Sequence, residues 1–288
     1  MRHLCNTFLD GGSAAEKMWL EPLLAASLAT APAHLRLSAE IDKLAHACAK
    51  GLGEGVHLYG KGEGAKNYRP YLEKKHGDKL HLKLERVDKG TRQDAKTQSA
   101  LILYYNRPLI VEFLSTALYS TSNVLRDNLY VTLNCQEVIA VLRGRGIIHD
   151  KLTTRLRFFS ASNALDEWSN MDMAKVMSKL RDALTAIITD PSIALDESYD
   201  PFEELKAEVP AYMDYLKELD GVTAPSVNGE TKIHSTRAVR KELYEPTDKD
   251  NRKATDLTKE HLVAFATGML KTFENGQGAR YVHDGEYR

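Results

Sequence analysis

Apolar residues recur at helical spacing along most of the chain. The most regular run begins at Asn170, a residue type that caps helices, and stops before Pro191, whose ring ends one. Its apolar residues would share one helix face: Met173, Val176, Met177, Leu180, Leu184, Ile187 and Ile188. The same period predicts further helices, which would begin near Ser13, Ser38, Pro108, Pro201 and Thr258. Helices should therefore make up most of the fold.

Two regions show the two-residue alternation that is typical of β-strands. Between Val56 and Val87, the leucines at positions 80, 82 and 84 alternate with charged and polar residues after a glycine-rich turn. Between Leu129 and Phe159, the segments 129–135 and 155–158 alternate in the same way. We therefore predict an α+β fold, predominantly helical with a small mixed β-sheet formed by 56–87 and 129–159. The helices that begin at Pro108 and Asn170 would pack on that sheet.

The order of these elements predicts three stretches of the chain. Residues 1–90 would hold an N-terminal helical hairpin and a small strand-loop-helix-strand unit, and residues 91–190 a central core with a basic segment. Residues 191–288 would hold an acidic helix, a second basic segment and a terminal helix. A chain of 288 residues could equally form one continuous domain from these stretches.

Composition places the chain among soluble proteins. Apolar residues make up 43% of it and charged residues 27%, which is close to globular usage and excludes a wholly disordered or fibrous class. No uncharged run reaches the ~20 residues of a transmembrane helix. The first apolar run, Met18–Ala29, contains Glu21 and Pro22 and lacks the layout of a signal peptide. We expect a cytoplasmic, intracellular protein with no membrane partner.

The three cysteines, Cys5, Cys48 and Cys135, lie far apart in the sequence. Their spacing matches neither a thiolate metal clip nor a redox pair, so we expect reduced, buried thiols. A catalytic Cys135 is the alternative, although no activating neighbour is visible in the sequence. We expect neither a metal site nor a cofactor, with Mg²⁺ entering only under the nuclease alternative given below.

The formal net charge is only −1, but cations gather between Arg143 and Arg157, which we call the central basic segment. Asp150 is its one acid, and its cations are Arg143, Arg145, Lys151, Arg155 and Arg157. In a strand, Arg155 and Arg157 would lie on one face beside Phe159. Arginine neutralises phosphates and aromatic rings stack on bases, so the segment indicates a protein that binds nucleic acid, either RNA or DNA.

Two further pairs of cations extend this predicted surface. Lys61 lies within a glycine-rich turn and Lys66 follows it, and the backbone amides of this turn could contact phosphate; Arg237 and Arg240 form a second basic patch. The alternative is that the central arginines pair inside the protein with the segment 190–220, which is rich in acids and contains only two lysines.

Other features suggest two alternatives to nucleic-acid binding. Asp220, followed by Glu230 and Lys232, resembles the acid…Glu-x-Lys pattern of the restriction-endonuclease-like superfamily. This resemblance implies a nuclease in which carboxylates hold Mg²⁺ and the lysine orients or activates water. The other hypothesis is a non-enzymatic structural or assembly subunit, in which complementary basic and acidic regions join copies of the chain as a homo-oligomer.

Overall fold

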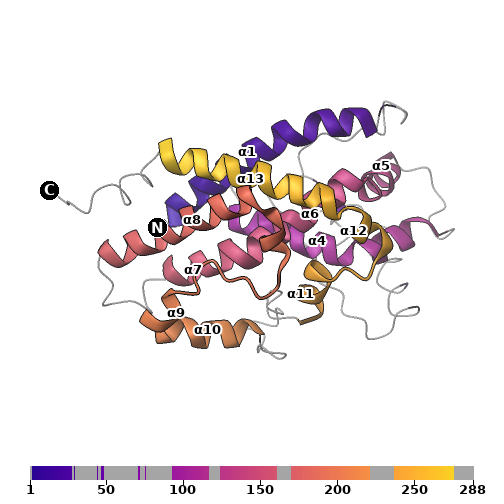
Figure 1. Cartoon of the computed structure of the whole chain (residues 1–288). Helices are drawn as coiled ribbons and strands as arrows, with labels where there is room; N and C mark the ends of the chain where they lie inside the picture. Colours follow the sequence, from indigo (N-terminus) through magenta and orange to yellow (C-terminus); the bar gives the residue numbers. More distant parts are fainter. Residues whose placement is uncertain are drawn as a thin grey trace. The chain divides into compact units, whose positions relative to one another are not determined.

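The fold is known from a computed structural model, which describes residues 2–27, 29, 44, 47–48, 71, 75, 93–116, 124–160, 170–220 and 237–275. Over these residues every regular element is a helix (Figure 1). The predicted α+β fold with a small mixed sheet is therefore wrong: the described part of the chain is all-helical.

The segments predicted as strands between residues 129 and 159 form helices. Leu129 and Leu133 lie one turn apart in α5 (Val124–Leu133), and both are buried. In α7 (Thr154–Ser160), Arg155, Leu156 and Phe158 are buried although they point in different directions around the helix. A helix that is buried on most sides has little polar face, so a short alternation in its sequence does not indicate a strand.

The other predicted strand region, 56–87, lies outside the described residues, except for Tyr71 and Lys75, which are helical. The helix predicted from Asn170 is confirmed as α8 (Asn170–Thr189). Pro108, predicted to begin a helix, lies instead inside α4 (Gln93–Leu114).

The described helices belong to two compact units. Unit 1 comprises residues 1–19, 147–245 and 259–288, and unit 2 comprises residues 20–146 and 246–258. Three helices contribute residues to both: α1 (Arg2–Ser27), α6 (Gln136–Ile148) and α13 (Thr255–Asn275). Unit 2 also contains α4, α5 and α12 (Lys249–Lys253). The predicted division into 1–90, 91–190 and 191–288 stays a prediction.

The other elements of unit 1 follow one another from residue 149 onward. They are the π-helix η3 (His149–Thr153), α7, α8, the 3-10 helix η5 (Pro191–Leu195), α9 (Leu205–Glu208), α10 (Pro210–Asp220) and α11 (Arg237–Tyr244).

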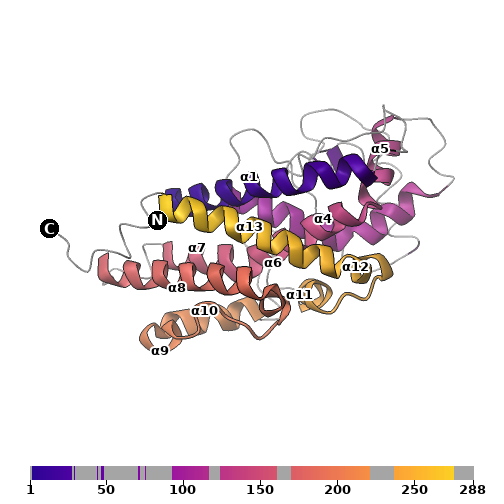
Figure 2. The same ribbon diagram turned by 45° about the horizontal axis from the view of Figure 1, so that its top comes forward.

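In unit 1 the first part of α1 runs beside α13 (Figure 2). Glycines allow the two backbones to touch, because a Cβ on Gly11 would meet the carbonyl oxygen of Gly268 and the side chain of Thr272. The rings of Phe8 and Phe273 close one end of this contact, with centroids 5.2 Å apart.

Aromatic side chains of α7 and α10 form a second set of packing contacts in unit 1. The Phe158 ring stacks on Tyr215 at 4.9 Å between centroids, and the Phe159 ring lies 4.8 Å from that of Tyr212. Phe202, which precedes α9, packs against Phe159 at 5.5 Å. These contacts fix α10 and the start of α9 against the helix that carries Arg155.

Unit 2 contains a buried arginine of its own, Arg107 on α4. Its Nε donates to the side-chain oxygen of Asn251 at 3.0 Å, and its Nη2 forms an ion pair with Asp248. Asp248 also caps α12 by accepting from the backbone amides of Asp250 and Asn251. Arg107 therefore holds the segment around α12 to α4 within this unit.

Candidate functional site

The site begins with a local distortion of the helix that carries the central basic segment. Residues His149–Thr153 form one turn of π-helix between α6 and α7, and all five side chains are buried. The turn closes through the amide of Thr154, which donates to the carbonyl oxygen of His149, and the Thr154 hydroxyl donates to the same oxygen at 2.8 Å. Such π-helical turns recur at functional sites, so the buried charged residues of this turn, Asp150 and Lys151, are candidates for functional residues.

Asp150 is the buried acid of the π-helix. The Tyr244 hydroxyl donates to its carboxylate at 2.5 Å, and Arg240 Nε lies 3.6 Å from the other carboxylate oxygen. Burial alone would raise the pKa of Asp150, but the charges of Arg155 and Arg240 more than offset it and hold that pKa below its ordinary value. Asp150 therefore remains a carboxylate inside the protein.

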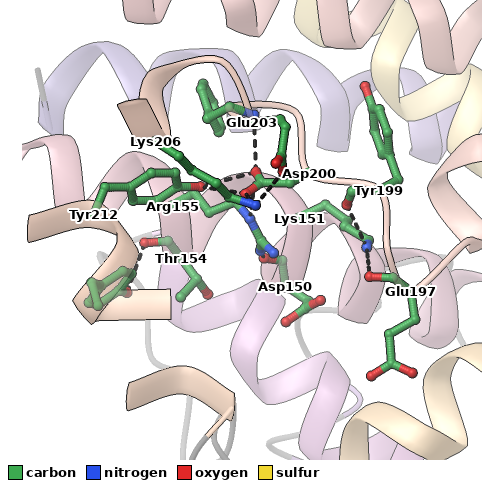
Figure 3. Close-up of polar contacts among 12 residues, drawn as sticks. Asp150, Lys151, Thr154, Arg155, Glu197, Tyr199, Asp200, Glu203, Lys206 and Tyr212 are labelled. Carbon is green, nitrogen blue, oxygen red and sulfur yellow. Dashed lines mark hydrogen bonds and ion pairs between the residues drawn. The ribbon is translucent and has the colours of Figure 1, made fainter. Parts of the chain in front are cut away.

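Lys151 is fully buried and binds the segment 196–204, which we call the strap. Its Nζ donates to the backbone carbonyl oxygens of Glu197 at 2.8 Å and Tyr199 at 2.7 Å (Figure 3). The same nitrogen lies 4.6 Å from the ring centroid of Tyr244, a cation–π contact. Burial lowers the pKa of Lys151 to about 8. The Lys151 ammonium group therefore holds the strap against the π-helix by hydrogen bonds to two of the strap's backbone carbonyl oxygens.

Arg155 holds the middle of the strap through Asp200. Its Nε lies 3.2 Å from the Asp200 carboxylate, and both side chains are buried. Its Nη1 donates to the backbone oxygen of Asp150, one turn earlier. Nearby Asp150 keeps the pKa of Arg155 above its ordinary value although burial acts in the opposite direction. The two cations of the π-helix region therefore bind adjacent parts of one strap.

A second buried polar pair of unit 1 joins α1 to α13. His261 Nε2 lies 2.7 Å from the Glu16 carboxylate, and both side chains are almost completely buried. The Trp19 ring meets the imidazole edge-on at 5.8 Å between centroids. Nothing in the sequence pattern links residues 245 positions apart, so this pair had no signal that sequence reasoning could use.

The structure brings together three of the cations that the sequence proposed for nucleic-acid binding. Lys151, Arg155 and Arg240 surround Asp150 in unit 1, and Arg240 Nη2 also lies 3.8 Å from the Glu197 carboxylate. Arg157, on the same helix as Arg155, is exposed. Contact of these residues with a nucleic acid stays a prediction.

The remaining proposed cations are placed elsewhere or not described. Arg143 and Arg145 lie on the part of α6 that belongs to unit 2, where both are buried, and Arg143 donates to the Thr255 hydroxyl at 2.9 Å. Arg237 is the first residue of α11, but its side chain is outside the described part, as are Lys61 and Lys66.

The nuclease residues also fall largely outside the described part of the chain. Asp220 is the last residue of α10, and its side chain is not described, whereas Glu230 and Lys232 lie in the undescribed range 221–236. The nuclease hypothesis stays a prediction. Among the described residues, no group of three or more His, Cys, Asp or Glu side chains could hold a metal ion.

Two of the three cysteines are buried, as the sequence predicts. Cys48 and Cys135 are both buried free thiols, and the side chain of Cys5 is outside the described part. Burial raises the pKa of Cys135 to about 12, and its thiol donates to the Glu137 carboxylate at 2.8 Å. Cys135 is therefore a protonated thiol at neutral pH, which does not support the nucleophile alternative.

Sequence reasoning missed Asp200, Tyr212 and Tyr244. The acidic run 190–220 was a usable signal for Asp200, because it is the nearest concentration of acid along the chain. Helical spacing places Tyr212 on the apolar face of the helix predicted from Pro201, but nothing in the sequence directs its hydroxyl to Asp200, and Tyr244 has no comparable signal.

No known protein family, curated protein or solved structure matches the chain. None of the described helices is both long enough and apolar enough to cross a membrane.

Proposed function

We propose that this chain is a non-enzymatic structural or assembly subunit. The observation that carries the proposal is the internal use of its central cations: Lys151 and Arg155 bind the strap, and Arg240 lies against Asp150. A buried cation that is already bound meets an external phosphate only after those contacts break, and leaving its partner unpaired is costly. These side chains connect segments that are distant in sequence, and so fix the shape of the surface that those segments form. A surface of fixed shape supports a role in assembly.

The surface that we propose for assembly is the outer face of the strap, α9 and α10. Its exposed acids are Asp196, Glu197, Glu203, Glu204, Glu208, Asp214 and Glu218. Several of them contact lysines of the same chain, such as Lys217 with Asp214 at 2.9 Å and Lys175 with Glu208 at 2.6 Å. Exposed ion pairs of this kind contribute little to stability, so these acids can exchange partners. The partner that this charge fits is a second copy of the chain, through the exposed cations of its α12: Lys249, Arg252 and Lys253.

Sedimentation velocity over a range of protein concentrations tests the proposal. We expect an oligomer whose proportion increases with concentration and decreases with added salt, because salt screens contacts between charged surfaces. A chain that stays monomeric at high concentration and low salt would contradict the proposal.

A matched pair of variants locates the surface. Replacing Glu208 and Glu218 by glutamine removes two exposed acids from α9 and α10, and we expect it to weaken the oligomer. Replacing Glu260 and Glu274 by glutamine removes two exposed acids from α13 and should leave it unchanged. Equal effects of the two double variants would show that net charge, not this surface, controls assembly.

Nucleic-acid binding is a second candidate because Arg157, a member of the central basic segment, is exposed. Fluorescence anisotropy with labelled single- and double-stranded DNA and RNA, each at two salt concentrations, distinguishes the two functions. The assembly proposal predicts no salt-dependent binding. Binding that weakens in the Arg157→Gln variant, but not in a Lys271→Gln control on α13, would favour the nucleic-acid candidate instead.

A further inference from the structure

The carboxylate of Asp200 lies in a set of donors that come from three helices and from the strap itself. Arg155 Nε of α7 lies 3.2 Å from one oxygen, and the Tyr212 hydroxyl of α10 donates to the two oxygens at 3.0 and 3.3 Å (Figure 3). Lys206 Nζ of α9 lies 3.2 Å from the second oxygen, and the amide of Phe202 in the strap donates at 3.0 Å. This carboxylate therefore receives more donors than a simple ion pair supplies.

Two of these donors are positioned by contacts that do not involve Asp200. The Arg155 guanidinium also donates to the backbone oxygen of Asp150, which fixes its orientation. The Tyr212 ring packs against Phe158 and Phe159, at 5.4 and 4.8 Å between centroids. A donor set that is held by its surroundings keeps its geometry when its ligand leaves, which is the condition for a binding site.

We propose that Arg155, Lys206 and Tyr212 form a carboxylate-binding site that the chain fills with its own Asp200, so that the strap is an internal ligand. A free monocarboxylate of the size of acetate binds the same donors when this side chain is removed or swings out. The site goes beyond the assembly role proposed above and does not depend on it.

The charge and the exposure of the site support a small anion as its ligand. Two cations and a phenol face the position of the carboxylate, and charge-assisted hydrogen bonds of this kind favour an anionic ligand over a neutral one. The side chain of Lys206 is 24% exposed, so the outer edge of the site borders solvent and an ion can enter there. The planar pair of oxygens that the donors now bind is the shape of a carboxylate and differs from the tetrahedral shape of phosphate.

The experiment is the rescue of an Asp200→Ala variant by added anion. Removing the carboxylate leaves Arg155 buried without this partner, so we expect a lower Tm than in the unsubstituted chain. Titration with sodium acetate should then raise the Tm of the variant by a few degrees relative to sodium chloride at equal ionic strength, because the anion binds the folded state only. The unsubstituted chain, whose site is filled, should show no such difference.

Two control variants make the rescue specific. Glu203→Ala removes an exposed carboxylate of the same strap, one that contacts Lys206 but not Arg155, and should not respond to acetate. The double variant Arg155→Met with Asp200→Ala should lose the response, because the main cation of the site is gone. An equal response of the double variant, or a larger response of Asp200→Ala to phosphate than to acetate, would overturn the proposal.

A second measurement covers the case in which Asp200→Ala does not fold. Hydrogen exchange of the unsubstituted chain then reports on the strap, whose backbone amides at residues 197–200 and 202–204 should exchange faster in acetate than in chloride as the free anion competes with Asp200. Exchange that is equal in the two salts, together with a variant that acetate does not rescue or allow to fold, would sink the proposal.

Discussion

The hydroxyl of Tyr244 donates a hydrogen bond of 2.5 Å to the carboxylate of Asp150, which lies 94 residues earlier in the sequence. Burial raises the pKa of Tyr244 well above its ordinary value, and the neighbouring carboxylate acts in the same direction. The phenol therefore keeps its proton at neutral pH and remains a donor. One buried hydrogen bond to a charged group thus connects α11 to the π-helix inside unit 1.

Replacing Tyr244 by phenylalanine tests this connection. The ring remains, but the buried carboxylate loses a donor, and hydrogen bonds to charged groups contribute about 1.5–3 kcal/mol. We expect the free energy of unfolding to fall by about that amount in urea titrations followed by circular dichroism.

The control for this prediction is Tyr130→Phe, which removes a hydroxyl from an exposed ring of α5. That change should be close to neutral, since the lost hydroxyl is hydrated in both states. If the two variants unfolded at the same urea concentration with equal slopes, the bond to Asp150 would contribute nothing measurable.

The sequence pattern predicts α8 correctly and α7, the helix of Arg155, wrongly. The prediction of α8 succeeds because a half-exposed helix keeps the contrast between apolar and polar faces on which it depends. In α7 that contrast is absent, so the alternation of Arg155 and Arg157 with Leu156 and Phe158 predicts a strand where the structure has a helix.

The same error affected the predicted site. A strand would have placed Arg155 and Arg157 together on one face, whereas in α7 Arg155 is buried against Asp200 and Arg157 is exposed. The sequence indicates that the central arginines could pair with the acidic run 190–220. It does not indicate that the partner of Arg155 is Asp200, because that depends on the path of the strap. Charge patterns indicate that partners exist, and only tertiary packing selects them.

The buried lysine gives the protein an unusual dependence on pH. Burial lowers the pKa of Lys151 to about 8 from its ordinary value of 10.5, so between these values the unfolded chain binds more protons than the folded one. The free energy of unfolding should therefore rise with pH across this window, as far as Lys151 alone contributes. Near pH 10 buried tyrosines begin to act in the opposite direction: burial raises the pKa of Tyr215 to about 12, so only its unfolded form ionises there.

The rise is measured as the urea midpoint at a series of pH values from 8 to 10, in the unsubstituted chain and in Lys151→Met. Methionine cannot titrate, so the variant should lose the rise. Lys217→Met, at an exposed lysine, serves as the control and should retain it. A Lys151→Met variant whose midpoint rises as steeply as that of the unsubstituted chain would contradict the assignment.

The helix contact in unit 1 predicts an effect of alanine that runs against helix propensity. In an exposed helix, glycine to alanine is stabilising by about 1 kcal/mol. At Gly11 the added methyl group would instead collide with the backbone of Gly268, so Gly11→Ala should lower the free energy of unfolding by about 1–3 kcal/mol, the usual cost of overpacking. Thermal unfolding shows whether the substitution stabilises or destabilises the protein. A variant with an unchanged or higher Tm would show that α1 and α13 can move apart to fit the methyl group without loss of stability.

The Glu16–His261 pair predicts a difference between two substitutions of one residue. His261 Nδ1 is buried with no hydrogen-bond partner among the described residues, so the contact of Nε2 with Glu16 is the one that satisfies the ring. Glu16→Leu would leave that nitrogen unpaired as well, and an unsatisfied buried polar group costs about 1–3 kcal/mol. Glu16→Gln keeps an oxygen that can accept from the imidazole and should cost less. Urea unfolding of the two variants decides the matter: if glutamine is as destabilising as leucine, the pair stabilises the fold through its charge and not through the hydrogen bond.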